Sequence, residues 1–375
     1  MKKFLNSKNV REFIRILLAL GIGLSLGFIL TLFVSEEPIE AYKAFLTGPL
    51  SRLNRIGDWL EESLSLIFLG LAATIVFSAK QFYLGYEGQM ILSALASGTV
   101  AIYFPAPSAI RIPVAFLAGI IVATLWSVIP ALLKAYLDAN VLISSLMMNT
   151  IALRLFEYLL RTFLQLPNTN GIMSEQIPDE GRLSSFIPNL PFLAETRAAW
   201  SKATNVSWML YVAIAAVILA YVLMYKTKFG YEIRAVGANE KFAKYGGVNV
   251  KKTIVASILI SGIFSGLAGA HLVMGIIERI IQGMGFGFGF EGINVSILAA
   301  GNPLGVPVAG LFYGYLRSGA DVMERSSDVS RELVFVVQAA VLLLLTAERL
   351  LPTVQQVVET DEAGEKAEPA KGSVK

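Results

Sequence analysis

The sequence predicts an all-α, polytopic membrane protein of about ten transmembrane helices. We expect an inverted repeat within it, with broken or re-entrant helices. Three observations support this. Hydrophobic residues make up 55% of the 375 residues and charged residues only 16%, whereas a soluble domain carries about a quarter charged. Several apolar stretches lack charge over lengths that cross a bilayer, and one glycine-containing tetrad occurs before two of the predicted helices.

The apolar stretches define the predicted spans in order. Charge-free runs occupy residues 16–34, 63–79, 88–110, 112–133, 203–225 and 253–277. A further span at 140–163 is interrupted by Arg154, Glu157 and Arg161, and the stretch 285–351 supplies three more, of which the first two are short. The basic lead and first apolar run resemble a signal peptide but lack a small-residue cleavage site, so we interpret them as a retained anchor.

The distribution of basic residues predicts the orientation. Together, the lead 1–15, Lys80, Lys134, the loop 226–252 and the tail contain more than half of the chain's 31 Lys and Arg residues, whereas the long loops 35–60 and 164–206 contain three each. Because basic loops resist translocation, we expect both termini in the cytoplasm of a multi-pass cell-membrane protein. The expected organisation is a cytoplasmic lead 1–15, a transmembrane domain 16–351 and a disordered cytoplasmic tail 352–375, which is poor in apolar residues.

Composition excludes several kinds of chemistry. The chain has no cysteine and one histidine, which removes thiolate sites and most zinc chemistry, and its net charge of +3 does not suggest nucleic acid. No Gly-Lys dipeptide occurs, so the sequence lacks an ATP-hydrolysing phosphate loop. We therefore expect no catalytic residue, no metal and no cofactor bound by this chain.

The repeated tetrads are Gly85-Tyr-Glu87-Gly88 and Gly289-Phe-Glu291-Gly292, each at the start of an apolar helix. A carboxylate there faces free amide donors and the positive end of the helix dipole. In the predicted topology the two helices enter from opposite sides, as in inverted repeats around a midplane pathway. Capping of the helices and contact with a solute remain equally open roles for the two glutamates. The predicted pathway residues are Gly85, Glu87, Gly88, Gln89, Asn149, Glu291, Gly292 and Asn294.

Other polar residues inside predicted spans are interpreted structurally. Glu157 lies three and four positions from Arg154 and Arg161, so it can pair with either one, which we favour over solute binding. Asn149 either lines a pathway or makes an interhelical hydrogen bond. Ser265 and His271 are six residues apart, about 240° around a helix, and cannot form a catalytic dyad. We expect His271 to be packed and hydrogen-bonded.

Two segments outside the spans indicate docking. In the loop 226–252, Asn239 can cap a short helix that Gly246 or Gly247 ends, with Phe242 and Tyr245 on one face. Such a helix suits a partner's groove, although the residues alone favour a helix lying in the lipid headgroups. The outer loop 164–206 contains four prolines and is too long for a mere connector, so docking of a receptor and slack between helices are equally open.

The loop 226–252 also carries a family resemblance. Arg234-Ala-Val-Gly-Ala-Asn239, with Ala243 and Gly247-Val-Asn249, resembles the coupling segment of permease subunits from ABC importers of the sugar and nucleoside branch. The segments 82–89, 146–152, 287–293 and 299–303 resemble other marks of that family, over roughly residues 60–350. The long outer loop and extra first span look most like the longer permease of nucleoside importers. Tyr83 and Glu291 depart from the usual asparagine and aspartate, which weakens the substrate assignment more than the fold assignment.

The resemblance implies a transport subunit rather than an enzyme. Its implied partners are a second, homologous permease in a heterodimer, an ATPase subunit that uses ATP, and an extracytoplasmic substrate-binding lipoprotein, all in membrane lipid. The residues implied to couple to the ATPase are Arg234, Val236, Gly237, Asn239, Phe242, Tyr245 and Gly247. A simple-sugar permease is one alternative. An ion-coupled secondary transporter without an ATPase is another, and a membrane enzyme ranks last because no nucleophile and base are evident.

Overall fold

The computed structural model describes residues 35–167, 171–183 and 206–329, with isolated positions between 25 and 33 and at 204, 336 and 339. The predicted lead 1–15 and tail 352–375 lie outside the described residues, as do most of the predicted span 16–34 and nearly all of the chain after residue 329. The chain divides into two compact units, one comprising residues 47–318 and the other the residues before and after it.

The unit formed by the two ends of the chain contains most of α2 (Pro38–Thr47). Its aromatic Tyr42 packs against Phe28 and Phe45, with ring centroids 5.2 and 5.7 Å away. Ser35 Oγ donates a hydrogen bond of 2.6 Å to the Asp328 carboxylate, so segments almost 300 residues apart are joined. The early and late parts of the chain therefore fold together.

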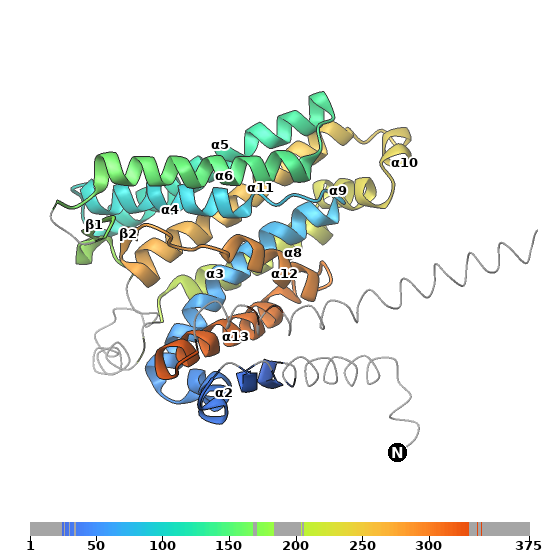
Figure 1. Cartoon of the computed structure of the whole chain (residues 1–375). Coiled ribbons are helices and arrows are strands. Elements are labelled where there is room, and N and C mark those ends of the chain that lie inside the picture. The colour runs from blue at the N-terminus through green and yellow to red at the C-terminus, as the bar shows by residue number, and fades with distance from the viewer. Residues whose placement is uncertain are drawn as a thin grey trace, which may run out of the picture. The chain divides into compact units, whose positions relative to one another are not determined.

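The unit of residues 47–318 is a bundle of helices (Figure 1). Its elements are η1 (Gly48–Leu50), α3 (Leu53–Ser78), α4 (Tyr86–Tyr103), α5 (Ser108–Leu137), α6 (Val141–Leu159), η2 (Leu160–Leu164), β1 (Met173–Gln176), η3 (Asp179–Gly181), α8 (Met209–Lys226), α9 (Lys228–Ala238), α10 (Glu240–Tyr245), α11 (Val250–His271), η5 (Leu272–Ile277), β2 (Arg279–Ile281), α12 (Phe288–Leu298) and the first part of α13 (Val306–Ser326). The segments η2 and η5 are π-helical continuations of α6 and α11.

Five helices among the described residues are long and apolar enough to cross a membrane: Leu53–Ser78, Ser108–Leu137, Val141–Leu164, Met209–Lys226 and Val250–Ile277. This confirms an all-α, multi-pass membrane protein. The predicted span 88–110 was drawn too long, because α4 ends at Tyr103 and α5 begins at Ser108. Pro105 and Pro107 separate them, since proline cannot continue a helix without losing a backbone hydrogen bond.

The helices differ in how deeply they are buried. In their most apolar windows, 83% of α3 and 67% of the helix beginning with α11 are buried, against 28% to 33% for the helices of α5, α6 and α8. Helices α3 and α11 therefore form the centre of the bundle. The large apolar side chains exposed on α5, α6 and α8 are the surface expected to meet lipid.

Small residues allow α11 to approach its neighbours closely. A Cβ atom on Gly262 or Gly266 would lie 2.8 and 2.7 Å from the backbone of Thr124 and Ile120 in α5. Gly269 lies equally tightly against Met90 and Ser93 in α4. The stripe of small residues is therefore a packing surface, as is usual for membrane helices.

The two ends of this bundle are built differently. Figure 1 shows α9 and α10 at one end and the antiparallel pair β1–β2 at the other. Ile177 is fully buried and its N–H donates to the backbone carbonyl of Glu278, while Gly181 packs on the carbonyl of Ala101. The part of the outer loop at 171–183 is thus anchored to the bundle and does not act as slack.

Candidate functional site

The two repeated tetrads lie directly against each other. Gly289 of the second tetrad contacts the backbone of Glu87 in the first so closely that no Cβ atom would fit between them. The N–H of Gly287 donates a hydrogen bond of 3.2 Å to Glu87 Oε1. Because Gly287 is the residue from which α12 begins, Glu87 caps the other helix and not its own. The sequence predicted the pair but not this contact.

The first tetrad is fixed by polar contacts from α6. Asn149 Nδ2 donates to the carbonyl of Leu84 at 2.7 Å, and its Oδ1 accepts from the N–H of Gly88 at 2.9 Å. Ser145 Oγ accepts from the N–H of Leu84 at 3.0 Å. Of the two roles considered for Asn149, the interhelical hydrogen bond is the one that the geometry contains.

Several polar atoms at the first tetrad are buried without a hydrogen-bond partner among the described residues: Tyr86 Oη, Glu87 Oε2 and Gln89 Oε1. Gln89 is fully buried, and its amide N–H donates to Tyr83 Oη at 2.9 Å. Gly85 faces the same Tyr83 ring, which leaves no room for a side chain. Buried polar groups are ordinarily paired, so such a cluster marks a place where water or a polar ligand can bind.

The second tetrad is held by an ion pair. Arg317 Nη1 lies 2.7 Å from both carboxylate oxygens of Glu291, and its guanidinium carbon lies 3.8 Å from the ring centroid of Phe288. Glu62 approaches the same arginine at 4.0 Å. A charge inside a membrane is tolerated when it is paired, and this arrangement neutralises Glu291.

The remaining contacts of α12 place it against α3 and α13. Gly292 packs against Leu69 with no space for a Cβ atom, and Asn294 Nδ2 donates to Tyr313 Oη at 3.2 Å. The structure therefore brings the predicted residues of the two tetrads together around the Glu87–Gly289 contact. Asn294 sits farther along the helix, on the side of α13.

The sequence did not point to Arg317 or Glu62 as partners of the second tetrad. Arg317 follows Glu291 by 26 residues and has no local spacing relationship to it. One signal could have found it, because Glu291 and Arg317 are the two charged residues that bound the charge-free stretch 292–316. An ionisable residue within a span is by default a functional candidate.

Other polar residues in the spans form structural contacts. His271 is fully buried, with Nε2 2.7 Å from Glu61 and Nδ1 2.8 Å from Ser65 Oγ. The expectation of a packed, hydrogen-bonded histidine is confirmed, and Ser265 Oγ makes no hydrogen bond with it or with any other described residue. Glu61 also accepts hydrogen bonds from the backbone and side chain of Ser207, which ties the start of α8 to α3.

Arg154 is the arginine that pairs with Glu157, at 3.0 Å, and Gln282 donates to the other oxygen of Glu157 at 3.3 Å. Arg154 and Glu157 border a cavity of about 230 Å³ between α6 and the loop before α12. Pockets for small molecules usually measure about 300 to 1,000 Å³. This cavity alone is therefore smaller than a typical binding pocket.

The predicted docking helix forms as α10. Asn239 Oδ1 accepts from the N–H of Phe242 at 3.0 Å, and Gly247, with φ of +82°, follows the end of the helix. Phe242 and Tyr245 are 74% and 92% exposed, so their rings contact little within this chain. The prediction of a capped helix with two exposed aromatics is confirmed.

The residues before α10 anchor it instead of facing outward. Val236 is buried, and Gly237 packs on the backbone of Ser78 at the end of α3. Arg234 stacks on Tyr225 at 5.0 Å. From α10, Glu240 accepts a hydrogen bond of 3.2 Å from Gln81, which lies in the loop leading to the first tetrad. The exposed helix and the first tetrad are thus connected through four residues of loop.

Comparison with known proteins supports the resemblance. The family described as branched-chain amino acid transport system / permease component matches residues 55–346. A glucose ABC transporter permease protein of Haloferax volcanii is 30% identical, over 92% of this chain and 90% of its own length. A guanosine ABC transporter permease protein of Bacillus subtilis is 30% identical, over 88% and 92%. A nucleoside ABC transporter permease protein of Lactococcus lactis is 26% identical, over 94% and 97%.

Proposed function

The chain belongs to the family of permease components of the branched-chain amino acid transport type, and from this we propose that it is the permease subunit of an ATP-driven importer of nucleosides. The proposed motor is a separate ATPase subunit that docks on α10 from the cytoplasm. A lipoprotein receptor would deliver the solute at the end of the bundle that carries β1 and β2. Both termini are assigned to the cytoplasm in this proposal.

The observation that carries the proposal is the route from α10 to the first tetrad. Exposed Phe242 and Tyr245 offer a docking surface on a helix whose Glu240 is bonded to Gln81. Movement of α10 would therefore displace the loop that ends at Gly85. An ion-coupled transporter, the rival interpretation, has no need of an exposed docking helix connected to its pathway.

The chemistry of the tetrads supports an uncharged, polar solute. Arg317 neutralises Glu291, while the unpaired atoms of Tyr86, Glu87 and Gln89 supply hydrogen-bond donors and acceptors. Nucleosides and simple sugars both satisfy this chemistry. We favour nucleosides because two of the relatives above are named for guanosine and nucleosides, and the sugar permease remains the alternative.

The small cavity beside Arg154 and Glu157 supports a second permease subunit. Its volume of about 230 Å³ is below the usual range for a small-molecule pocket. A facing subunit would enlarge and close the site. We propose a homologous permease in that place, so that the pathway forms between two chains.

The decisive experiment is F242A/Y245A, with the chain co-expressed with the ATPase and the receptor of its own system. We expect loss of ATPase co-purification and at least a tenfold fall in uptake of labelled guanosine, because two aromatic anchors of an interface carry much of its binding energy. The matched control F163A/Y211A removes two exposed aromatics away from α10 and should retain ATPase co-purification. Unchanged ATPase association and uptake in F242A/Y245A would refute the docking role.

A further inference from the structure

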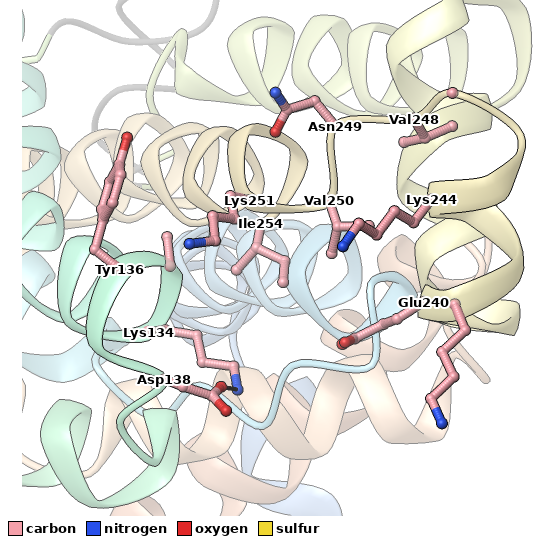
Figure 2. A pocket seen from close by; sticks show the side chains of 13 residues that line it. Lys134, Tyr136, Asp138, Glu240, Lys244, Val248, Asn249, Val250, Lys251 and Ile254 are labelled. Atoms are coloured by element: carbon pink, nitrogen blue, oxygen red, sulfur yellow. Dashed lines mark hydrogen bonds and ion pairs between the residues drawn. The ribbon is translucent and has the colours of Figure 1, made fainter.

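A second cavity, of about 700 Å³, lies beside α10 on the side predicted to be cytoplasmic (Figure 2). It opens between the end of α5, the docking helix α10 and the start of α11. Its size falls within the usual range for small-molecule sites. Neither the tetrads nor the exposed aromatics of α10 line it.

The charges that face the cavity are mostly positive: Lys134 and Asp138 from the end of α5, Glu240, Lys241 and Lys244 from α10, and Lys251 from α11. Lys134 and Asp138 neutralise each other through a contact of 2.6 Å, drawn as a dashed line in Figure 2. This hydrogen bond and the charge of Lys134 lower the pKa of Asp138. Glu240 accepts its hydrogen bond from Gln81.

Three lysines that line the cavity can contribute charge to a ligand. Within the part of the chain that the structure describes, Lys241 and Lys244 have no acidic partner. Lys251 lies 5.5 Å from the ring centroid of Tyr136, and its charge also acts on Asp138 without forming an ion pair among the described residues. Three ammonium groups around one cavity favour an anion with several acceptor oxygens, such as a phosphate.

The surface beside the cavity identifies the source of that phosphate. Leu125, Ile129, Leu132 and Tyr136 are exposed at spacings of three and four residues, so they form one apolar stripe along α5 that ends at the cavity. Such a stripe is a surface for acyl chains. A phospholipid could lie with its chains along the stripe and its headgroup among the lysines, with Tyr136 at the interface.

We propose that this cavity binds the headgroup phosphate of an anionic phospholipid of the cytoplasmic leaflet. The lipid would connect α10 to α5 by its phosphate. This site is separate from the solute pathway. It depends on the predicted orientation, in which this end of the bundle meets the leaflet that carries anionic lipid.

The test is retention of dioleoylphosphatidylglycerol against dioleoylphosphatidylcholine by the purified full chain, measured by native mass spectrometry. A lysine near an anionic surface strengthens binding about fivefold, so K241Q/K244Q should weaken phosphatidylglycerol retention by about 25-fold. The control K226Q/K228Q removes the same formal charge from exposed positions outside the cavity, where Lys228 is paired with Glu232, and should weaken retention much less than K241Q/K244Q does. Equal losses in both variants would overturn the proposal, as would no loss in K241Q/K244Q.

Further measurements separate the remaining explanations. The substitution V248W narrows the cavity without changing charge and should also lower phosphatidylglycerol retention, whereas unchanged retention would contradict a site in the cavity. Binding of soluble glycerol 3-phosphate below 1 mM in phosphatidylcholine would show a soluble ligand instead of a lipid. If assembly with the ATPase releases the lipid, the cavity binds an acidic group of that partner in the complex, and the lipid proposal is wrong. Thermal unfolding of each variant in phosphatidylcholine verifies its fold.

Discussion

The two tetrads share the order glycine, aromatic, glutamate, glycine, yet the contacts that hold them differ. Around the first, Asn149 and Ser145 bond to backbone groups, and Glu87 accepts from one backbone N–H. Around the second, Glu291 is paired with Arg317. A buried acid is therefore accommodated in one place by amide donors and in the other by a counter-ion.

The backbone conformation near the two tetrads also differs. Gly283, Gly285 and Gly287 have φ values of +76°, +68° and +85°, which only glycine adopts without strain, whereas Gly85 has a φ of −79°. The loop before the second tetrad needs glycine for backbone conformation, whereas Gly85, Gly289 and Gly292 within the tetrads need it for space. The same sequence pattern therefore does not imply that the two regions tolerate glycine substitutions equally well.

The largest effect is expected from R317Q. This change leaves Glu291 buried without its counter-ion, and breaking a buried ion pair on one side costs about 3 to 5 kcal/mol. Thermal unfolding in detergent should show a large loss of stability. The control R325Q removes an exposed arginine from the same helix and should have little effect.

The double variant E291Q/R317Q sharpens this prediction. Because it removes both charges, it should recover much of the stability lost in R317Q. A double variant as unstable as R317Q would show that Arg317 acts through contacts other than Glu291, such as those with Phe288 or Glu62.

An intermediate effect is expected from N149A. The change orphans the carbonyl of Leu84 and the N–H of Gly88, at about 1 to 3 kcal/mol for each unsatisfied group. Unfolding temperature and uptake should both fall. The control T150A changes the exposed neighbour on α6 and should leave the unfolding temperature within error, while an unaffected N149A would mean that the first tetrad is held elsewhere.

The smallest effect is expected from E87Q. Glutamine keeps the acceptor oxygen for Gly287, so the change in stability should stay below about 1 kcal/mol. The matched variant E291Q should be much less stable, because it leaves Arg317 buried without the carboxylate. Equal stability of E87Q and E291Q, compared by thermal unfolding, would contradict the distinction drawn between the two tetrads.

Local signals in the sequence predicted much of this architecture. Charge-free runs located the helices, and Asn239 with Gly247 located α10, because spans and caps are determined by neighbouring residues. Local signals could not predict contacts between segments that are far apart along the chain. Met173 pairs with Ile281 over a hundred residues later, and the approach of Gly289 to Glu87 depends on how four helices pack.

One error had a local signal that was overlooked. Pro105 and Pro107 break the apolar run between α4 and α5, although the run contains no charge. Hydropathy describes whether a segment tolerates lipid, whereas the end of a helix depends on backbone hydrogen bonding. The end of an apolar run often coincides with the end of a helix, but it does not do so between α4 and α5.

Helix α3 contacts both the segment before α10, where the ATPase subunit is proposed to dock, and the tetrads of the proposed pathway. Its end at Ser78 supports Gly237, its middle at Leu69 supports Gly292, and the loop that continues it reaches Gly85. A single displacement of α3 at its cytoplasmic end would therefore move both tetrads at the same time. Alternating exposure of the solute to the two sides of the membrane would then require only one mechanical input per cycle.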